Sequence, residues 1–220
     1  MSRIYLLSVR KDIILQKKYL LILTPLLIIA NIFICNKLDG VVGELMGIFL
    51  IELFGIHVIF NSLCQAEDNE FGRNALIVSP YSRKGFVLGR YLFIALLFMY
   101  IYALNIIASN ISNIVFLKFS FQKANLMMLS ITALFLSFWN GINLTLYYKF
   151  GYSKMKILGN ILVFLTPFIL PTMTKYIETK INLSINFDPI LLIVIFMILS
   201  FIMYIVSAML SLYFFSKRDL

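Results

Sequence analysis

Charged residues are scarce in this chain of 220 residues. Asp, Glu, Lys and Arg make up only 13% of it, whereas hydrophobic residues make up 61%. Soluble globular domains are typically about 25% charged and about 45 to 50% apolar. The composition therefore excludes an ordinary soluble globule and indicates a membrane protein.

The residues that most often carry catalysis or bind metals are also few. His57 is the only histidine, which excludes an H-E-x-x-H site and any site built from several histidines. The chain contains no G-x-x-x-x-G-K-[ST] loop to cradle ATP phosphates and no G-x-S-x-G nucleophile elbow. Of the two cysteines, Cys35 is expected at the outer end of the first span and Cys64 near the inner end of the second. They should not meet, so they do not predict a disulfide. We expect no enzyme activity, metal or cofactor in this chain.

Long apolar runs, by contrast, are abundant. Six of them predict membrane spans at about 19–35, 41–64, 91–114, 124–148, 157–174 and 189–216. A helix needs roughly 17 to 25 such residues to cross a bilayer, and continuous apolar runs do not alternate as barrel strands do. The sequence predicts an all-α polytopic membrane protein in which residues 1–220 form a single transmembrane domain.

The basic residues predict how these spans are oriented. The net charge is +9, but the bases lie between the spans, so we expect contact with membrane lipid and not with nucleic acid. If the N-terminus is cytoplasmic, only five of the 19 bases lie outside: Lys37, Lys118, Lys123, Lys175 and Lys180. The positive-inside rule therefore places both termini in the cytoplasm.

Residues 1–18 predict an amphipathic helix at the membrane surface. Tyr5, Leu6, Val9 and Ile13 share one sector of a helical wheel, and the five bases share another. Such a helix would lie in the cytoplasmic interface, with its bases toward anionic headgroups. An equal alternative is that these bases only set the topology.

The cytoplasmic loop 65–90 has the most informative pattern. Phe71, Ala75 and Val78, at i, i+4 and i+7, predict a short helix with an apolar stripe outside the bilayer. Pro80 should end that helix, and Ser82 is a suitable N-cap for the next one. Three acids stand at the start of the loop: Glu67, Asp68 and Glu70. The apolar stripe needs a surface to pack on, whether the membrane, its own bundle or another protein.

These features together resemble the permease subunits of ABC type-2 exporters, a compact bacterial family with a separately encoded ATPase. The resemblance in topology covers the whole chain, and the sequence motif lies within residues 65–90. Besides the three acids, the motif consists of Pro80, Ser82, Arg83 and Arg90. The chain departs from many relatives in having Ser79 before Pro80 and Phe86 in place of a β-branched or leucine residue.

The resemblance implies that the loop between spans two and three carries a coupling helix for a cytoplasmic ATPase. The residues that would contact the ATPase are Glu67, Asp68, Glu70, Phe71, Arg73, Ala75 and Val78. ATP and Mg would be bound by that partner, and a second permease chain, identical or paralogous, would complete the transporter. The expected location is the bacterial cytoplasmic membrane. Permeases that export toxin-like or antimicrobial peptides are similar in size, so the resemblance favours an amphipathic peptide as substrate.

The resemblance also implies re-entrant helices on the outer side, between spans five and six. Pro167 and Pro171 lie in the outer half of the predicted fifth span and would suit such a shape. A simple kinked helix is the alternative.

The second predicted span is unusual in carrying polar residues. Glu52, His57 and Asn61 lie within it, and ionisable groups at such depth usually face a bundle interior or a wet cavity. One interpretation is a translocation path that recognises cationic parts of a substrate. The other is that Glu52 forms hydrogen bonds that hold helices together.

A different class of function is an ATP-independent small channel, a holin-like pore or an immunity protein. Such a protein should be complete alone, whereas a permease should co-purify with an ATPase that has a P-loop.

The predicted topology can be tested by labelling in intact cells. We replace both native cysteines and introduce Ser82→Cys, which should react with a membrane-impermeant maleimide only after permeabilisation. Asn36→Cys, in an expected outer loop, is the matched control and should react without it. Labelling of the Ser82→Cys variant from outside would contradict the orientation.

Overall fold

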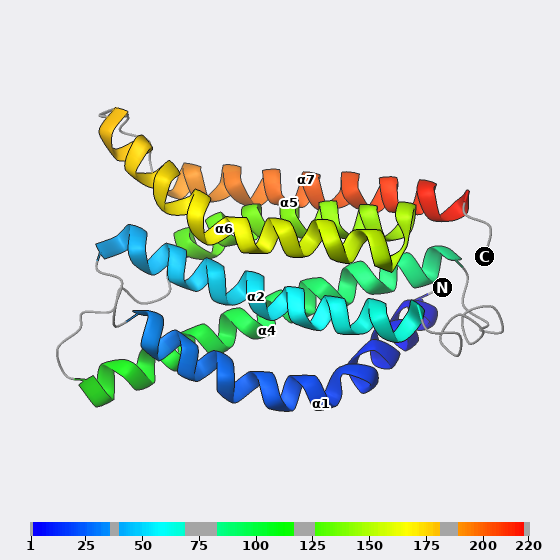
Figure 1. The fold of residues 1–220 in the computed structure, drawn as a ribbon, viewed down its shortest axis with the longest axis horizontal. Helices are drawn as coiled ribbons and strands as arrows, with labels where there is room; N and C mark the ends of the chain where they lie inside the picture. The colour runs from blue at the N-terminus through cyan, green and yellow to red at the C-terminus, as the bar shows by residue number, and fades with distance from the viewer. Residues whose placement is uncertain (1, 36–39, 69–82, 117–125, 181–188, 218–220) are drawn as a thin grey trace.

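The computed structural model describes residues 2–35, 40–68, 83–116, 126–180 and 189–217. This part of the chain consists of six helices and no strand (Figure 1): α1 (Ser2–Cys35), α2 (Gly40–Asp68), α4 (Arg83–Phe116), α5 (Leu126–Phe150), α6 (Tyr152–Lys180) and α7 (Pro189–Ser216).

Among the described residues, five segments are long and apolar enough to cross a membrane: Leu7–Phe33, Gly47–Asp68, Lys84–Ala108, Leu126–Phe150 and Ile190–Ser216. They confirm an all-α polytopic membrane protein. The predicted fifth span, 157–174, lies in α6, which is not among these five segments.

Helix α2 lies at the centre of the bundle. It contacts α1, α4, α5 and α6, and 72% of its most apolar window is buried, against 6% for α7 and 11% for α1. α1 packs along α4, and α5 packs along α7. Because α7 is strongly apolar yet exposed in the single chain, its outer surface suits hydrocarbon.

Helix α1 is continuous, although the sequence predicts an interfacial helix over 1–18 followed by a separate span. No glycine or proline stands near the expected junction, so nothing there stops the helix, which curves along its length (Figure 1). Ser8, Asp12 and Gln16 on its inner face are buried against the bundle. The location of this segment in the interface remains a prediction.

Helix α6 is also continuous through Pro167 and Pro171, and Figure 1 shows it bent toward its end. A kink is the usual effect of proline within a helix. This backbone agrees with the alternative of a kinked helix. Re-entrant helices remain a prediction, and the 181–188 segment lies outside the described residues.

A sharp turn at Gly151 joins α5 to α6. Its φ of 84° lies in the left-handed region, which glycine adopts without steric cost. The Gly151 amide donates to the Tyr147 carbonyl at 2.9 Å and so caps the end of α5. The turn reverses the direction of the chain, so α6 begins at the end of the bundle where α5 stops.

Small residues allow α5 and α7 to pack closely. A Cβ added at Gly141 would lie 3.0 Å from Oγ and 3.1 Å from Cβ of Ser207 on α7. The Ser207 hydroxyl also donates to the Gly141 carbonyl at 2.9 Å. Small residues and hydroxyl groups of this kind are typical of helix contacts within membranes.

This contact can be tested by enlarging Gly141. We expect Gly141→Leu to lower the free energy of unfolding by about 1 to 3 kcal/mol, because the side chain would force α5 and α7 apart. Denaturation of the purified protein in detergent measures the change. Phe138→Leu, at an exposed position of α5, is the control and should have a small effect. Equal stability of the two variants would contradict the close contact.

Candidate functional site

The most highly charged site in the described part of the chain surrounds Arg90 on α4, a fully buried side chain. Its Nε donates to Oδ2 of Asp12 on α1 at 3.1 Å, and its Nη2 donates to Oε1 of Glu67 on α2 at 2.5 Å. Lys11 of α1 donates to the same Glu67 oxygen at 2.8 Å. Two bases and two acids therefore join three helices with no net charge, and we call these four residues the Arg90 cluster.

Neighbouring aromatic residues complete the cluster. The Tyr147 hydroxyl on α5 donates to Oε2 of Glu67 at 3.2 Å. This hydrogen bond connects a fourth helix, α5, to the cluster. The ring of Phe86 lies 4.6 Å from Lys11 Nζ and 5.4 Å from the Arg90 guanidinium carbon. Removal of one partner from such a buried network is costly, because it leaves a buried charge unpaired.

The Arg90 cluster lies beside the ends of two helices that flank the predicted coupling loop. Glu67 is the penultimate residue of α2, and Arg90 lies two turns after the start of α4. The 69–82 segment connects these two helices. The ion pair between Glu67 and Arg90 therefore joins the end of α2 to the first turns of α4, on either side of that segment.

The structure places the predicted coupling residues in two groups. Asp68 is exposed, whereas Glu67 is only 5% exposed and faces the bundle interior. Glu67 therefore does not lie on a free surface as the sequence suggests, because Arg90 and Lys11 bind its carboxylate. Of the motif, Arg83 begins α4 and Arg90 is the buried centre of the cluster. The other predicted residues lie outside the described part: Glu70, Phe71, Arg73, Ala75, Val78, Pro80 and Ser82.

Sequence reasoning missed Asp12, which pairs with Arg90, and Lys11, which pairs with Glu67. One signal was present, because Asp12 is the only acid among the first 38 residues and stands in a segment otherwise rich in bases. An acid on the apolar side of a basic helix indicates a buried cationic partner.

A second polar cluster surrounds Glu52, which is fully buried in α2. Asn105 of α4 donates to Glu52 Oε1 at 3.3 Å, and Asn31 of α1 donates to Asn105 Oδ1 at 2.7 Å. These contacts match the alternative in which Glu52 holds helices together.

His57 and Asn61 point to a different helix. His57 Nε2 lies 2.9 Å from Oδ1 of Asn160 on α6, and Asn61 Nδ2 lies 2.8 Å from His57 Nε2. Gly159 permits this approach, since a Cβ there would lie 2.8 Å from Asn143 Oδ1 and 3.3 Å from His57 Cε1. Sequence analysis did not identify Asn160.

Glu52, His57 and Asn61 therefore do not all lie on one face of α2. His57 follows Glu52 by five residues, which turns the helix by about 140° beyond a full revolution. Glu52 consequently contacts α4, whereas His57 and Asn61 contact α6. The residues assigned to a possible translocation path thus fall into two interhelical clusters.

An apolar groove of about 340 Å³ lies between α4, α5 and α7. Its polar lining includes Ser137, Asn140, Ser200 and Tyr204, among otherwise apolar side chains. Such a groove could hold an acyl chain or an apolar side chain of a ligand.

The model of a family described as ABC-2 family transporter protein matches residues 9–216. No curated protein matches the chain, and no solved structure matches it.

Substitution of two adjacent acids, Glu67 and Asp68, tests how much the Arg90 cluster contributes to stability. Glu67→Gln should lower the free energy of unfolding by about 3 to 5 kcal/mol, because Asp12 alone would then face Arg90 and Lys11. Asp68→Asn removes the same charge one residue later, at an exposed position, and should change stability by less than about 0.5 kcal/mol. Unfolding in detergent measures both. A Glu67→Gln variant as stable as Asp68→Asn would mean that the cluster contributes nothing.

Proposed function

Since the chain belongs to the ABC-2 family of transporter proteins, we propose that it is the membrane-spanning permease subunit of an exporter driven by a separate ABC ATPase. The observation that carries this proposal is the Arg90 cluster. It fixes the helix ends on both sides of the 69–82 segment, where the sequence predicts a coupling helix.

Coupling requires that movement of a cytoplasmic partner reach the spans. A loop anchored on mobile ends would absorb that movement, whereas one anchored on a buried ionic network would transmit it to α1, α2 and α4 together. Within the loop, the apolar stripe of Phe71, Ala75 and Val78 would bind the ATPase, with Asp68, Glu70 and Arg73 around it. Glu67 would act from inside the bundle, by positioning Arg90.

The partners follow from this assignment. Permeases of this family generally work with an ABC ATPase, which would hold ATP and Mg. A second permease chain, identical or paralogous, would form the other half of the transporter, because closed assemblies are usually symmetric. Both termini would lie in the cytoplasm of a bacterial cell.

We place the substrate in the hydrophobic or amphipathic class, with a peptide as the candidate. The groove between α4, α5 and α7 supports this class, because its apolar walls carry a few polar groups that could meet a peptide backbone. Glu52, His57 and Asn61 would contribute to a translocation path by setting the positions of the helices. The family match favours a permease over an ATP-independent channel, holin-like pore or immunity protein.

Phe71→Ala tests the coupling assignment. It should weaken binding of the ATPase by about 1 to 3 kcal/mol and reduce export, because an aromatic anchor of the interface is lost. Membrane insertion should not change, because the residue lies outside the predicted spans. Pull-down from detergent, with quantified ATPase, measures the effect.

Asn69→Ala, in the same loop but on the opposite side of the predicted helix from the apolar stripe, is the matched control. If the Phe71→Ala variant kept wild-type association with the ATPase and wild-type export, the coupling assignment would be wrong.

A further inference from the structure

A band of lysines and aromatic rings surrounds one end of α7, apart from the Arg90 cluster. Its lysines come from the start of α4 and the ends of the last three helices: Lys84, Lys149, Lys154 and Lys217. Its rings are Phe150, Tyr213 and Phe214. We call these residues the basic aromatic band.

Three of these four lysines lie over aromatic rings. Lys149 Nζ lies 4.9 Å from the ring centre of Phe150 and 5.0 Å from that of Phe214, so it bridges α5 and α7. Lys217 Nζ lies 4.3 Å from the ring centre of Tyr213 and donates to its hydroxyl at 2.5 Å. Lys154 Nζ lies 5.9 Å from the ring centre of Phe150. Cation–π contacts of this kind leave the N–H groups free to meet an anion.

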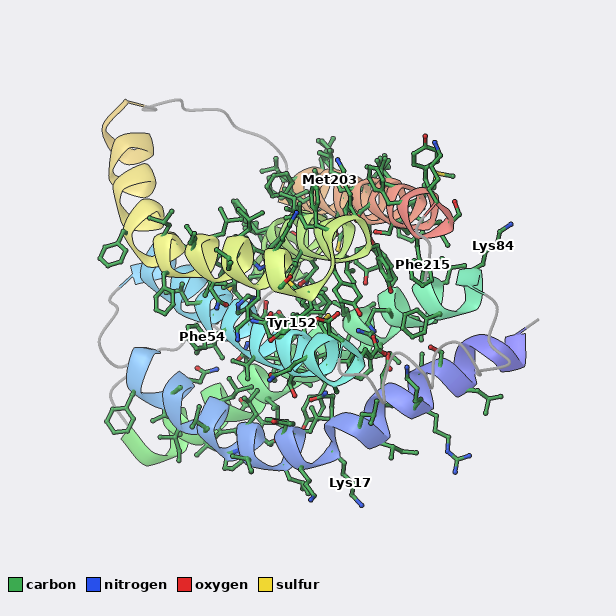
Figure 2. The ribbon with its side chains drawn as sticks, turned by 45° about the vertical axis from the view of Figure 1, so that its right-hand side comes forward. Lys17, Phe54, Lys84, Tyr152, Met203 and Phe215 are labelled. Atoms are coloured by element: carbon green, nitrogen blue, oxygen red, sulfur yellow. The ribbon has the colours of Figure 1, made fainter. Side chains whose placement is uncertain are left out.

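A small cavity extends the band toward α4. It has a volume of about 230 Å³ and is lined by Lys84, Leu212, Tyr213, Phe215 and Ser216. Figure 2 shows Lys84 and Phe215 near each other at this end of the bundle. Lys217 follows Ser216 directly, so two lysines stand at or beside the cavity.

The band carries charge that the described part of the chain does not neutralise. The ion pairs among the described residues join Lys11 and Arg90 to Asp12 and Glu67. None of these ion pairs includes a lysine of the band. Positive-inside topology requires only that lysines lie on this side of the membrane. It requires neither aromatic contacts that fix them nor a cavity beside them.

We propose that the basic aromatic band binds the headgroup of an anionic phospholipid. The phosphate would lie at the cavity beside Lys84 and Lys217, and the acyl chains would extend along α7. Met209 and Leu210 are exposed on that helix and offer the apolar surface. A lipid fits better than an acidic soluble protein, because the lysines stand where membrane spans end and beside side chains that suit hydrocarbon.

The test compares two double variants of the full chain, purified in detergent. Lys84→Gln with Lys217→Gln removes two charges from the band. Lys118→Gln with Lys123→Gln removes two charges from a predicted outer loop, on the other side of the membrane from the band. Native mass spectrometry with added phosphatidylglycerol or phosphatidylcholine measures bound lipid. Inorganic phosphate serves as a competitor.

We expect the wild-type chain to bind phosphatidylglycerol in preference to phosphatidylcholine, without displacement by equimolar phosphate. The band variant should bind it about fivefold more weakly for each lysine removed, the factor that corresponds to about 1 kcal/mol per base near an anionic surface. The outer-loop variant should bind as the wild-type chain does.

Three results would overturn the proposal. The first is unchanged lipid binding by the band variant. The second is equal loss in both variants, which would indicate general surface charge. The third is loss of ATPase association by the band variant while it keeps its lipid, which would make the band a protein contact. Circular dichroism of each variant shows that it is folded.

Discussion

The burial of one guanidinium group is the constraint on which much of this bundle depends. Arg90 lies within an apolar interior, where its charge is tolerated only if acids are held against it. Asp12 and Glu67 meet that need from two other helices, and Tyr147 holds Glu67 from a fourth. The requirement for paired charge thus sets the relative positions of α1, α2, α4 and α5 at one end.

Hydrocarbon gives helices little reason to associate through apolar surface alone, so polar and small residues specify the contacts. Along α2, Glu52 selects α4, and His57 selects α6. Gly141 brings α7 against α5. Separate polar or small-residue contacts therefore help to specify each neighbour. The leucines and isoleucines divide between the buried core and the exposed surface that suits lipid.

This division bears on how a permease would work. Ion pairs join α1, α2 and α4 at the end near the predicted coupling loop. By contrast, neutral hydrogen bonds at Asn160 join α6 to α2, and α6 has a smaller contact with α5 than α7 has. Movement applied at the loop would then shift α1, α2 and α4 as a unit. Substrate would meet surfaces between such units and not the enclosed side chain of Glu52.

The sequence by itself determined the class, an all-α polytopic membrane protein, because the length of an apolar run is a local property of the chain. It did not determine every helix limit, because α1 runs without a break where an interfacial helix over 1–18 and a separate span at 19–35 were predicted. The family likewise followed from residues near Arg90. Only the tertiary structure decided which polar residues meet. Glu67 stands beside Asp68 in sequence, but a helix turns by about 100° per residue, so one carboxylate is buried and the other is exposed. Asp12 pairs with Arg90, and Asn160 with His57, from distant positions in the sequence. No local pattern encodes these pairings, because the packing of the helices decides which buried charges and amides meet.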